Sequence, residues 1–225
     1  FWHKQIYPHQ IWLDGVYMAE PFYAEYAKRY MTGAEQAEAY KEIVNEFLTA
    51  AKHTYDPATK LYRHAWDESR SMFWCDPQTG QSQHCWGRAL GWFCMAIVEV
   101  LDYLPADLAE RQSLIDLLRS ICAELPKWAD PQSGVWYQVL DQPGREGNYL
   151  EATCSAMFSY TFLKGIRMGY LDKDLLPYAK KVYEDVVKEF ISTDEQGRIS
   201  LGRRPGRQQQ AYGGFRILSQ RAYKA

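Results

Sequence analysis

The most regular feature of the chain is the return of apolar residues every three or four positions, which is typical of helices with one buried face. One such series consists of Leu90, Phe93, Cys94, Ile97, Val98 and Leu101. Gly33 and Pro105 mark short turns between neighbouring series. The pattern predicts six helices in three pairs, near residues 15–31, 34–52, 86–104, 107–128, 149–170 and 174–191.

A short turn motif follows the second helix of each pair. It reads DPATKLY from Asp56, DPQSGVW from Asp130 and, more loosely, DEQGRI from Asp194. The copies are about 65 to 75 residues apart, which is the spacing of a structural repeat. Asp-Pro and Gly favour a turn, and a short β-like stretch follows it. The repeating unit is therefore helix, tight turn, helix and long loop.

Hairpins of this kind can close side by side into a ring, with the long loops gathered at one mouth. A ring of six would need roughly 360 to 400 residues at this period, so 225 residues hold about half of it. Half a ring exposes apolar inner faces. Because the sequence also starts at Phe1, we expect residues 1–225 to form one partial domain whose N-terminal portion is missing.

Composition narrows the possible partners. The formal net charge is −2, without the concentrated basic face that nucleic acids or anionic membranes require. No apolar run reaches 18 residues, so no membrane span is expected. Five cysteines without a CxxC pair favour a reducing compartment, and we expect a cytoplasmic protein unless an export signal precedes Phe1. Aromatic residues make up 15% of the chain, and their flat faces and polar edges suit sugars.

The stretch HKQIYPHQIWLDGVYM, from His3 to Met18, has the densest candidate chemistry. Asp14 opens a predicted helix, and one interpretation makes it the N-cap, with its carboxylate on free backbone N–H groups. The other makes it an acid catalyst, whose pKa the apolar neighbours Ile11 and Trp12 would raise. The spacing of the two histidines, His3 and His9, from Asp14 matches no known metal site, and both could be structural.

A second candidate stretch is HCWGRALGW, from His84 to Trp92. Trp86, Arg88 and Trp92 begin a helix directly after a long loop, where they can surround one pocket. An arginine fork binds a sugar carboxylate at two points while indole rings cover the sugar faces. The alternative is an aromatic core with a surface arginine.

A third stretch, NYLEATCSAM from Asn148, is interpreted as a helix whose small residues allow close packing. Its Tyr149 and Glu151 are near enough to the helix start to reach the mouth. Glu20 and Asp67 are further carboxylates without a distinguishing context. No P-loop, GxSxG or HExxH motif occurs, so those enzyme classes gain no support.

These motifs, YPHQIWLDGVYMAEPF followed by HCWGRALGW, resemble glycoside hydrolase family 105, the unsaturated rhamnogalacturonyl hydrolases, which are related to the family 88 unsaturated glucuronyl hydrolases. The resemblance implies an all-α fold, an (α/α)6 toroid, of which this chain is about the C-terminal half to two-thirds. It implies hydration of the C4=C5 vinyl ether of a terminal unsaturated uronic acid on pectin-derived oligosaccharides, without a metal or an organic cofactor. Asp14 would be the general acid and base, and the substrate would be bound by His3, Met18, Trp86, Arg88 and Trp92.

Three alternatives remain open at this point. A family 88-like enzyme would act on glycosaminoglycan disaccharides. A sugar-binding fragment without activity would retain the fold but not the chemistry. A toroid epimerase would need essential histidines on several inner helices, and the predicted helices contain few.

Overall fold

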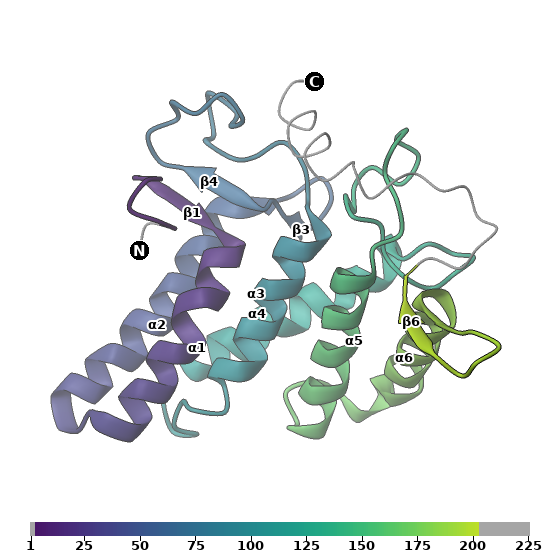
Figure 1. Cartoon of the computed structure of the whole chain (residues 1–225). Helices are drawn as coiled ribbons and strands as arrows, with labels where there is room; N and C mark the ends of the chain where they lie inside the picture. The colour runs from purple at the N-terminus through teal and green to yellow at the C-terminus, as the bar shows by residue number, and fades with distance from the viewer. Residues whose placement is uncertain (1–2, 203–225) are drawn as a thin grey trace.

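The computed structural model of the protein describes residues 3–202, in which six helices form two rows (Figure 1). The inner row consists of α1 (Leu13–Tyr30), α3 (Gly87–Val100) and α5 (Ala152–Arg167). Each is followed by an outer helix: α2 (Gly33–Thr54), α4 (Arg111–Glu124) and α6 (Leu176–Phe190). In the inner row, α3 packs between α1 and α5, so the three hairpins lie side by side as the repeat predicted.

All six predicted helices are confirmed, with shifts at their ends. The helix predicted over 86–104 ends at Val100, and the next begins only at Arg111 because a turn region containing Pro105 separates them. The last turn of the helix predicted over 107–128 is instead a separate 3-10 helix, η1 (Leu125–Trp128), where Pro126 breaks the α-helical pattern. A second 3-10 helix, η2 (Lys173–Leu175), leads into α6.

The long loops form short antiparallel ribbons near the N-terminal ends of the inner helices (Figure 1). β1 (Gln10–Trp12) pairs with β4 (Ala65–Asp67), and β2 (Tyr55–Asp56) pairs with β3 (Leu61–Tyr62). β5 (Ile191–Thr193) and β6 (Ile199–Leu201) form the third ribbon, which follows α6. These ribbons place loop residues over the start of the inner row.

The repeated Asp motif is a turn closed by its own side chain. Asp56, Asp130 and Asp194 each accept a hydrogen bond from a backbone N–H two or three residues ahead. Asp76 does the same in the sequence DPQTG, a fourth copy that the sequence reasoning overlooked. The fifth residue of the first three turns along the chain and the fourth residue of the last have a positive φ, 57° at Lys60 and 76° to 78° at Gly80, Gly134 and Gly197. Three of these positions are glycine because this backbone region disfavours side chains.

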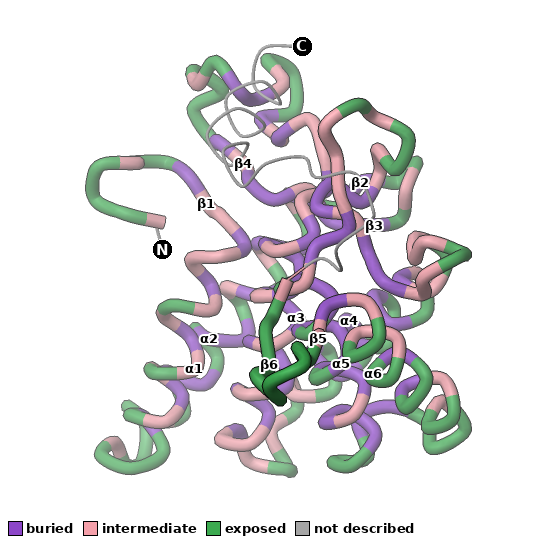
Figure 2. Tube along the Cα trace, turned by 45° about the vertical axis from the view of Figure 1, so that its right-hand side comes forward, coloured by how far each residue is buried: buried purple, intermediate pink, exposed green. Residues whose placement is uncertain are grey.

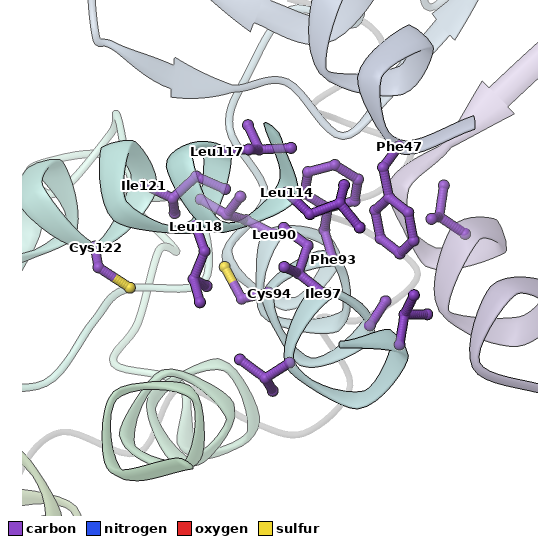
Figure 3. Close-up of a cluster of buried hydrophobic side chains, with 14 of the residues drawn as sticks. Phe47, Leu90, Phe93, Cys94, Ile97, Leu114, Leu117, Leu118, Ile121 and Cys122 are labelled. Atoms are coloured by element: carbon purple, nitrogen blue, oxygen red, sulfur yellow. The ribbon is translucent and has the colours of Figure 1, made fainter. Parts of the chain in front are cut away.

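A continuous apolar core lies between the two rows (Figures 2 and 3). Phe93 and Ile97 of α3 meet Leu114 and Leu118 of α4, with Phe47 of α2 beside them (Figure 3). All five cysteines are free and buried, as expected for small apolar side chains. Within residues 3–202, no helix has both the length and the apolar character needed to cross a bilayer.

Two glycines allow α3 and α5 to approach closely at the mouth. A Cβ atom added at Gly87 would lie 3.0 Å from the Sγ of Cys154 and from the backbone oxygen of Tyr137. One added at Gly91 would lie 2.7 Å from the Sδ of Met157. The glycines of HCWGRALGW therefore set the spacing at which residues of α3 and α5 can contact each other.

One face of α1 has exposed apolar side chains. Met18, Phe22, Tyr26 and Tyr30 recur every fourth residue and are 60%, 72%, 44% and 70% exposed. The arginine- and glutamine-rich segment from Arg203 to Gln210 lies outside the described residues.

Candidate active site

Asp14 lies in the first turn of α1, at the mouth of the inner row. The helix begins at Leu13, and Trp12 occupies the N-cap position without a side-chain capping bond. The interpretation of Asp14 as the N-cap is therefore wrong. β1 ends directly before α1, and the Leu13 N–H donates to the backbone oxygen of His64 at 3.0 Å. This connection fixes the start of α1 against the loop that follows α2.

The carboxyl of Asp14 is largely removed from water. Burial raises its pKa to about 6, against the opposing charges of Arg88 and Lys4. Its Oδ2 atom is buried and accepts no hydrogen bond from any residue between 3 and 202. A carboxyl in such surroundings keeps its proton at pH values where an exposed aspartic acid has lost it.

His3 lies against Gly15, the residue that follows Asp14. A Cβ atom at Gly15 would come within 2.5 Å of the His3 Nδ1, so the glycine of WLDG makes room for this ring. His3 stacks on Trp12 with ring centroids 5.1 Å apart, and burial together with Lys4 lowers its pKa to about 4. It is thus a neutral ring near neutral pH. Met18 lies one helical turn after Asp14 and is 60% exposed.

Arg88 lies in the first turn of α3, next to Trp86 and Glu151. Its guanidinium carbon is 5.6 Å from the centroid of the Trp86 ring. Its Nη2 donates to the Oε1 of Glu151 at 2.9 Å. The structure therefore brings Asp14, Trp86 and Arg88 to one mouth. Trp92 instead packs on Tyr17 of α1, with ring centroids 4.4 Å apart.

His64 is a residue of this region that the sequence reasoning missed. It is 7% exposed, and its ring centroid lies 5.8 Å from Trp12, 6.0 Å from Trp86 and 6.5 Å from Trp74. Burial lowers its pKa to about 4, so the imidazole is neutral. The sequence signal that could have identified His64 is its position just after the β2–β3 turn, because the chain leads from this turn into the mouth.

His84 joins the two loops that flank Arg88. Its Nδ1 lies 3.1 Å from the Oδ2 of Asp141, and the Cys85 N–H donates to Oδ1 of the same carboxylate at 2.9 Å. Burial by itself would raise the Asp141 pKa, but these two hydrogen bonds lower it. Arg145 lies 3.4 Å from the other ring nitrogen of His84. This arrangement holds the loop before α5 against the loop before α3.

Asp67 and Glu20, the two carboxylates without a distinguishing context in the sequence, have different surroundings in the structure. Asp67 accepts hydrogen bonds from Ser69, Ser71 and Met72 and thus shapes its own loop. Glu20 is fully buried in α1, and burial, with the nearby charge of Glu46, raises its pKa to about 8. Neither is part of the cluster of aromatic rings around Asp14 and Arg88.

The mouth thus offers a carboxyl group that can give up a proton, an arginine beside an indole ring, and neutral imidazoles among stacked rings. Residues 3–202 contain no group of three or more His, Cys, Asp or Glu side chains with metal-binding geometry. The similarity to known proteins places the chain among the glycoside hydrolases of the α/α-toroid class, in agreement with its helical hairpins in two rows.

The family model of Glycosyl Hydrolase Family 88 matches residues 1–212, and the chain belongs to this family. A solved family 105 glycoside hydrolase of C. acetobutylicum is 44% identical, with a TM-score of 0.85 over 89% of this chain and 55% of that one. This likeness confirms both the resemblance to family 105 and the toroid fold.

Two curated relatives extend the comparison. Protein Atu3128 of Agrobacterium fabrum is 37% identical over 191 residues, which cover 82% of this chain and 78% of that protein. The unsaturated rhamnogalacturonyl hydrolase YesR of Bacillus subtilis is 28% identical over 197 residues, 88% of this chain and 50% of YesR. The chain thus spans about half the length of YesR and of the solved family 105 enzyme.

Proposed function

We propose that the protein removes a terminal 4,5-unsaturated uronic acid from pectin-derived rhamnogalacturonan oligosaccharides. The observation that carries the proposal is the buried Asp14 carboxyl, with a pKa raised to about 6, at the same mouth as Arg88. Membership of Glycosyl Hydrolase Family 88 and the likeness to YesR, which is named for this activity, support it.

The reaction begins with protonation of a vinyl ether. Protonated Asp14 donates its proton to C4 of the unsaturated ring, and positive charge develops at C5 and on the ring oxygen. The resulting carboxylate then takes a proton from a water molecule whose oxygen bonds to C5. The hemiketal opens, the bond from C1 to the aglycone breaks, and the uronic acid leaves as a keto acid. One group performs both steps because donating a proton turns an acid into a base.

Arg88 gives the site its preference for an acidic sugar. A guanidinium beside an indole ring binds a carboxylate with two parallel hydrogen bonds while the ring covers a sugar face. Trp86 is that ring, at 5.6 Å from the Arg88 guanidinium carbon. His3 and Met18 border the bound sugar on the α1 side, and Trp92 supports this border through its contact with Tyr17.

The test follows loss of the ultraviolet absorbance of the C4=C5 bond in an unsaturated rhamnogalacturonan disaccharide, using the full-length protein. Asp14→Asn keeps the shape of the side chain without the acid, and we expect turnover to fall by about 10²–10⁴-fold. Glu20→Gln is the matched control, because Glu20 is also a buried carboxyl of α1 with a raised pKa. It should leave turnover near that of the wild type.

Each alternative has its own result in this assay. Turnover of unsaturated chondroitin disaccharide, with rhamnogalacturonan disaccharide untouched, would move the substrate to the glycosaminoglycans. A folded protein that spares both substrates but binds them would be a sugar-binding protein. Full turnover by Asp14→Asn would remove Asp14 from the mechanism.

A further inference from the structure

Glu151 connects the two inner helices α3 and α5 at the mouth. Its Oε1 accepts the hydrogen bond from the Arg88 Nη2 at 2.9 Å, and the Glu151 side chain is only 5% exposed. The loop before α5 places it there, because the Glu151 N–H donates to the backbone oxygen of Trp136 at 2.8 Å. A carboxylate in this position meets the arginine with little competition from water.

The second oxygen of Glu151 holds the side chain in place. Oε2 accepts the Cys154 N–H at 2.6 Å, so Glu151 is the N-cap of α5. The close approach of α3 to α5 at Gly87 and Gly91 leaves little room for the pair to shift. A rigid carboxylate on one side of the guanidinium, with the Trp86 ring close to it, limits the orientations that Arg88 can adopt.

The Glu151 carboxylate contacts one of the two cations that act on Asp14. These cations are Arg88 from α3 and Lys4 from the N-terminal segment, and both favour loss of the Asp14 proton. The His3 ring lies against Gly15, the His64 backbone oxygen accepts the Leu13 N–H, and both imidazoles are neutral near neutral pH. A carboxylate beside Arg88 has the opposite charge, and charges in partly buried sites act over several ångströms.

We propose that Glu151 is a positioning residue: it orients Arg88 for the carboxylate of the sugar and offsets enough of its charge for Asp14 to remain an acid. The inference rests on the proposed function, and it assigns Glu151 a role in that site beyond capping α5. An arginine without this counter-charge would bind the same anion but hold Asp14 in its ionised form.

Two substitutions in the full-length protein separate the effect of the Glu151 charge from that of its side-chain length. Glu151→Gln keeps the length and an oxygen for the Cys154 N–H but removes the charge. We expect the decline of kcat at rising pH to begin about 0.5–1 pH unit lower than in the wild type. Glu151→Asp keeps the charge and the cap but is one methylene too short for Arg88. We expect it to raise KM by about 3–10-fold, with little change in the pH profile.

A matched control changes an ion pair at the end of the α3–α5 pair that is away from the mouth. The Asp102 Oδ2 lies 2.6 Å from the Lys164 Nζ, with side-chain exposures of 31% and 5%. Asp102→Asn should change neither KM nor the pH profile. A double variant tests whether Glu151 acts on KM through Arg88. In the Arg88→Gln background, Glu151→Asp should no longer raise KM.

A direct titration of Asp14 makes the result independent of turnover. The ¹³C carboxyl resonance of Asp14 is identified by its loss in Asp14→Asn, and it should titrate at lower pH in Glu151→Gln. A folded Glu151→Gln with the wild-type titration and pH profile overturns the role of Glu151 while leaving the proposed function intact. A wild-type protein that spares every unsaturated uronate defeats the proposed function, and the titration still shows whether Glu151 controls Asp14.

Discussion

The two ends of the α3–α5 pair each contain an ion pair between these helices, and they differ in what surrounds the positive charge. At the end away from the mouth, the Lys164 Nζ lies 3.0 Å from Glu99 and 2.6 Å from Asp102. Tyr160 donates to Glu99, and Tyr170 donates to Asp102 at 3.5 Å. At the mouth, Arg88 contacts the carboxylate of Glu151, and the other nearby carboxyl is the buried Asp14.

Under the proposed function, the two ends of one helix pair would have separate roles, one in stability and one in chemistry. Burial opposes the charge on Lys164, but its two carboxylates outweigh burial and raise its pKa above its usual range. A cation with two anionic partners has little attraction left for a ligand. At the mouth, burial raises the Asp14 pKa to about 6, so that at lower pH the carboxylate of Glu151 is paired with Arg88 while the nearby Asp14 is neutral.

The largest expected effect comes from the mouth and concerns the pH dependence of turnover. The Asp14 pKa is raised, so the carboxyl holds its proton below about pH 6 and loses it above. Because the proposed reaction needs the protonated acid, we expect kcat to fall about tenfold per unit of pH above this value. The measurement is kcat under substrate saturation from pH 4 to 9. A flat profile over this range would contradict the assignment of Asp14.

The next effect should come from the end away from the mouth. Lys164→Met removes a cation that is 5% exposed and leaves two carboxylates together, so we expect unfolding to become easier by about 2–4 kcal/mol. Denaturant unfolding of the full-length protein measures this change. The pH profile of the remaining activity should match that of the wild type, and a shifted profile would mean that the two ends are coupled.

A smaller effect is expected for Arg88→Ala. Loss of charge-assisted hydrogen bonds to the sugar carboxylate, worth ~1.5–3 kcal/mol, should raise KM by about 10–100-fold. Removing a positive charge near Asp14 should also raise the Asp14 pKa, so the decline of kcat should move to higher pH. Initial rates against substrate concentration at several pH values test both expectations. An unchanged KM would separate Arg88 from carboxylate recognition.

The smallest effect concerns a hydrogen bond at the Lys164 end. Tyr160→Phe removes the hydroxyl that donates to Glu99, a bond at a partly exposed position. We expect a stability loss of no more than about 1 kcal/mol and an unchanged KM. Thermal unfolding and a Michaelis–Menten series measure the two quantities. A loss of activity in this variant would break the separation between the two ends.

The order and pairing of the helices could be predicted from the sequence. Apolar residues at helical spacing gave all six helices, because this periodicity depends only on neighbours within two turns. The WLDG and HCWGRALGW motifs brought attention to Asp14, Trp86 and Arg88, which do lie at one mouth. The Asp-based turns were also local, since each closes through its own side chain.

Only the tertiary structure decided which of these residues act together and in which charge state. Glu151 is 63 residues from Arg88, and His64 is 20 residues from His84, so no short pattern joins them. Asp14 was interpreted as a possible N-cap because its local sequence allows it, but Trp12 occupies that position. The pKa of Asp14 depends on burial by segments distant in sequence, because desolvation and Coulomb forces act through space.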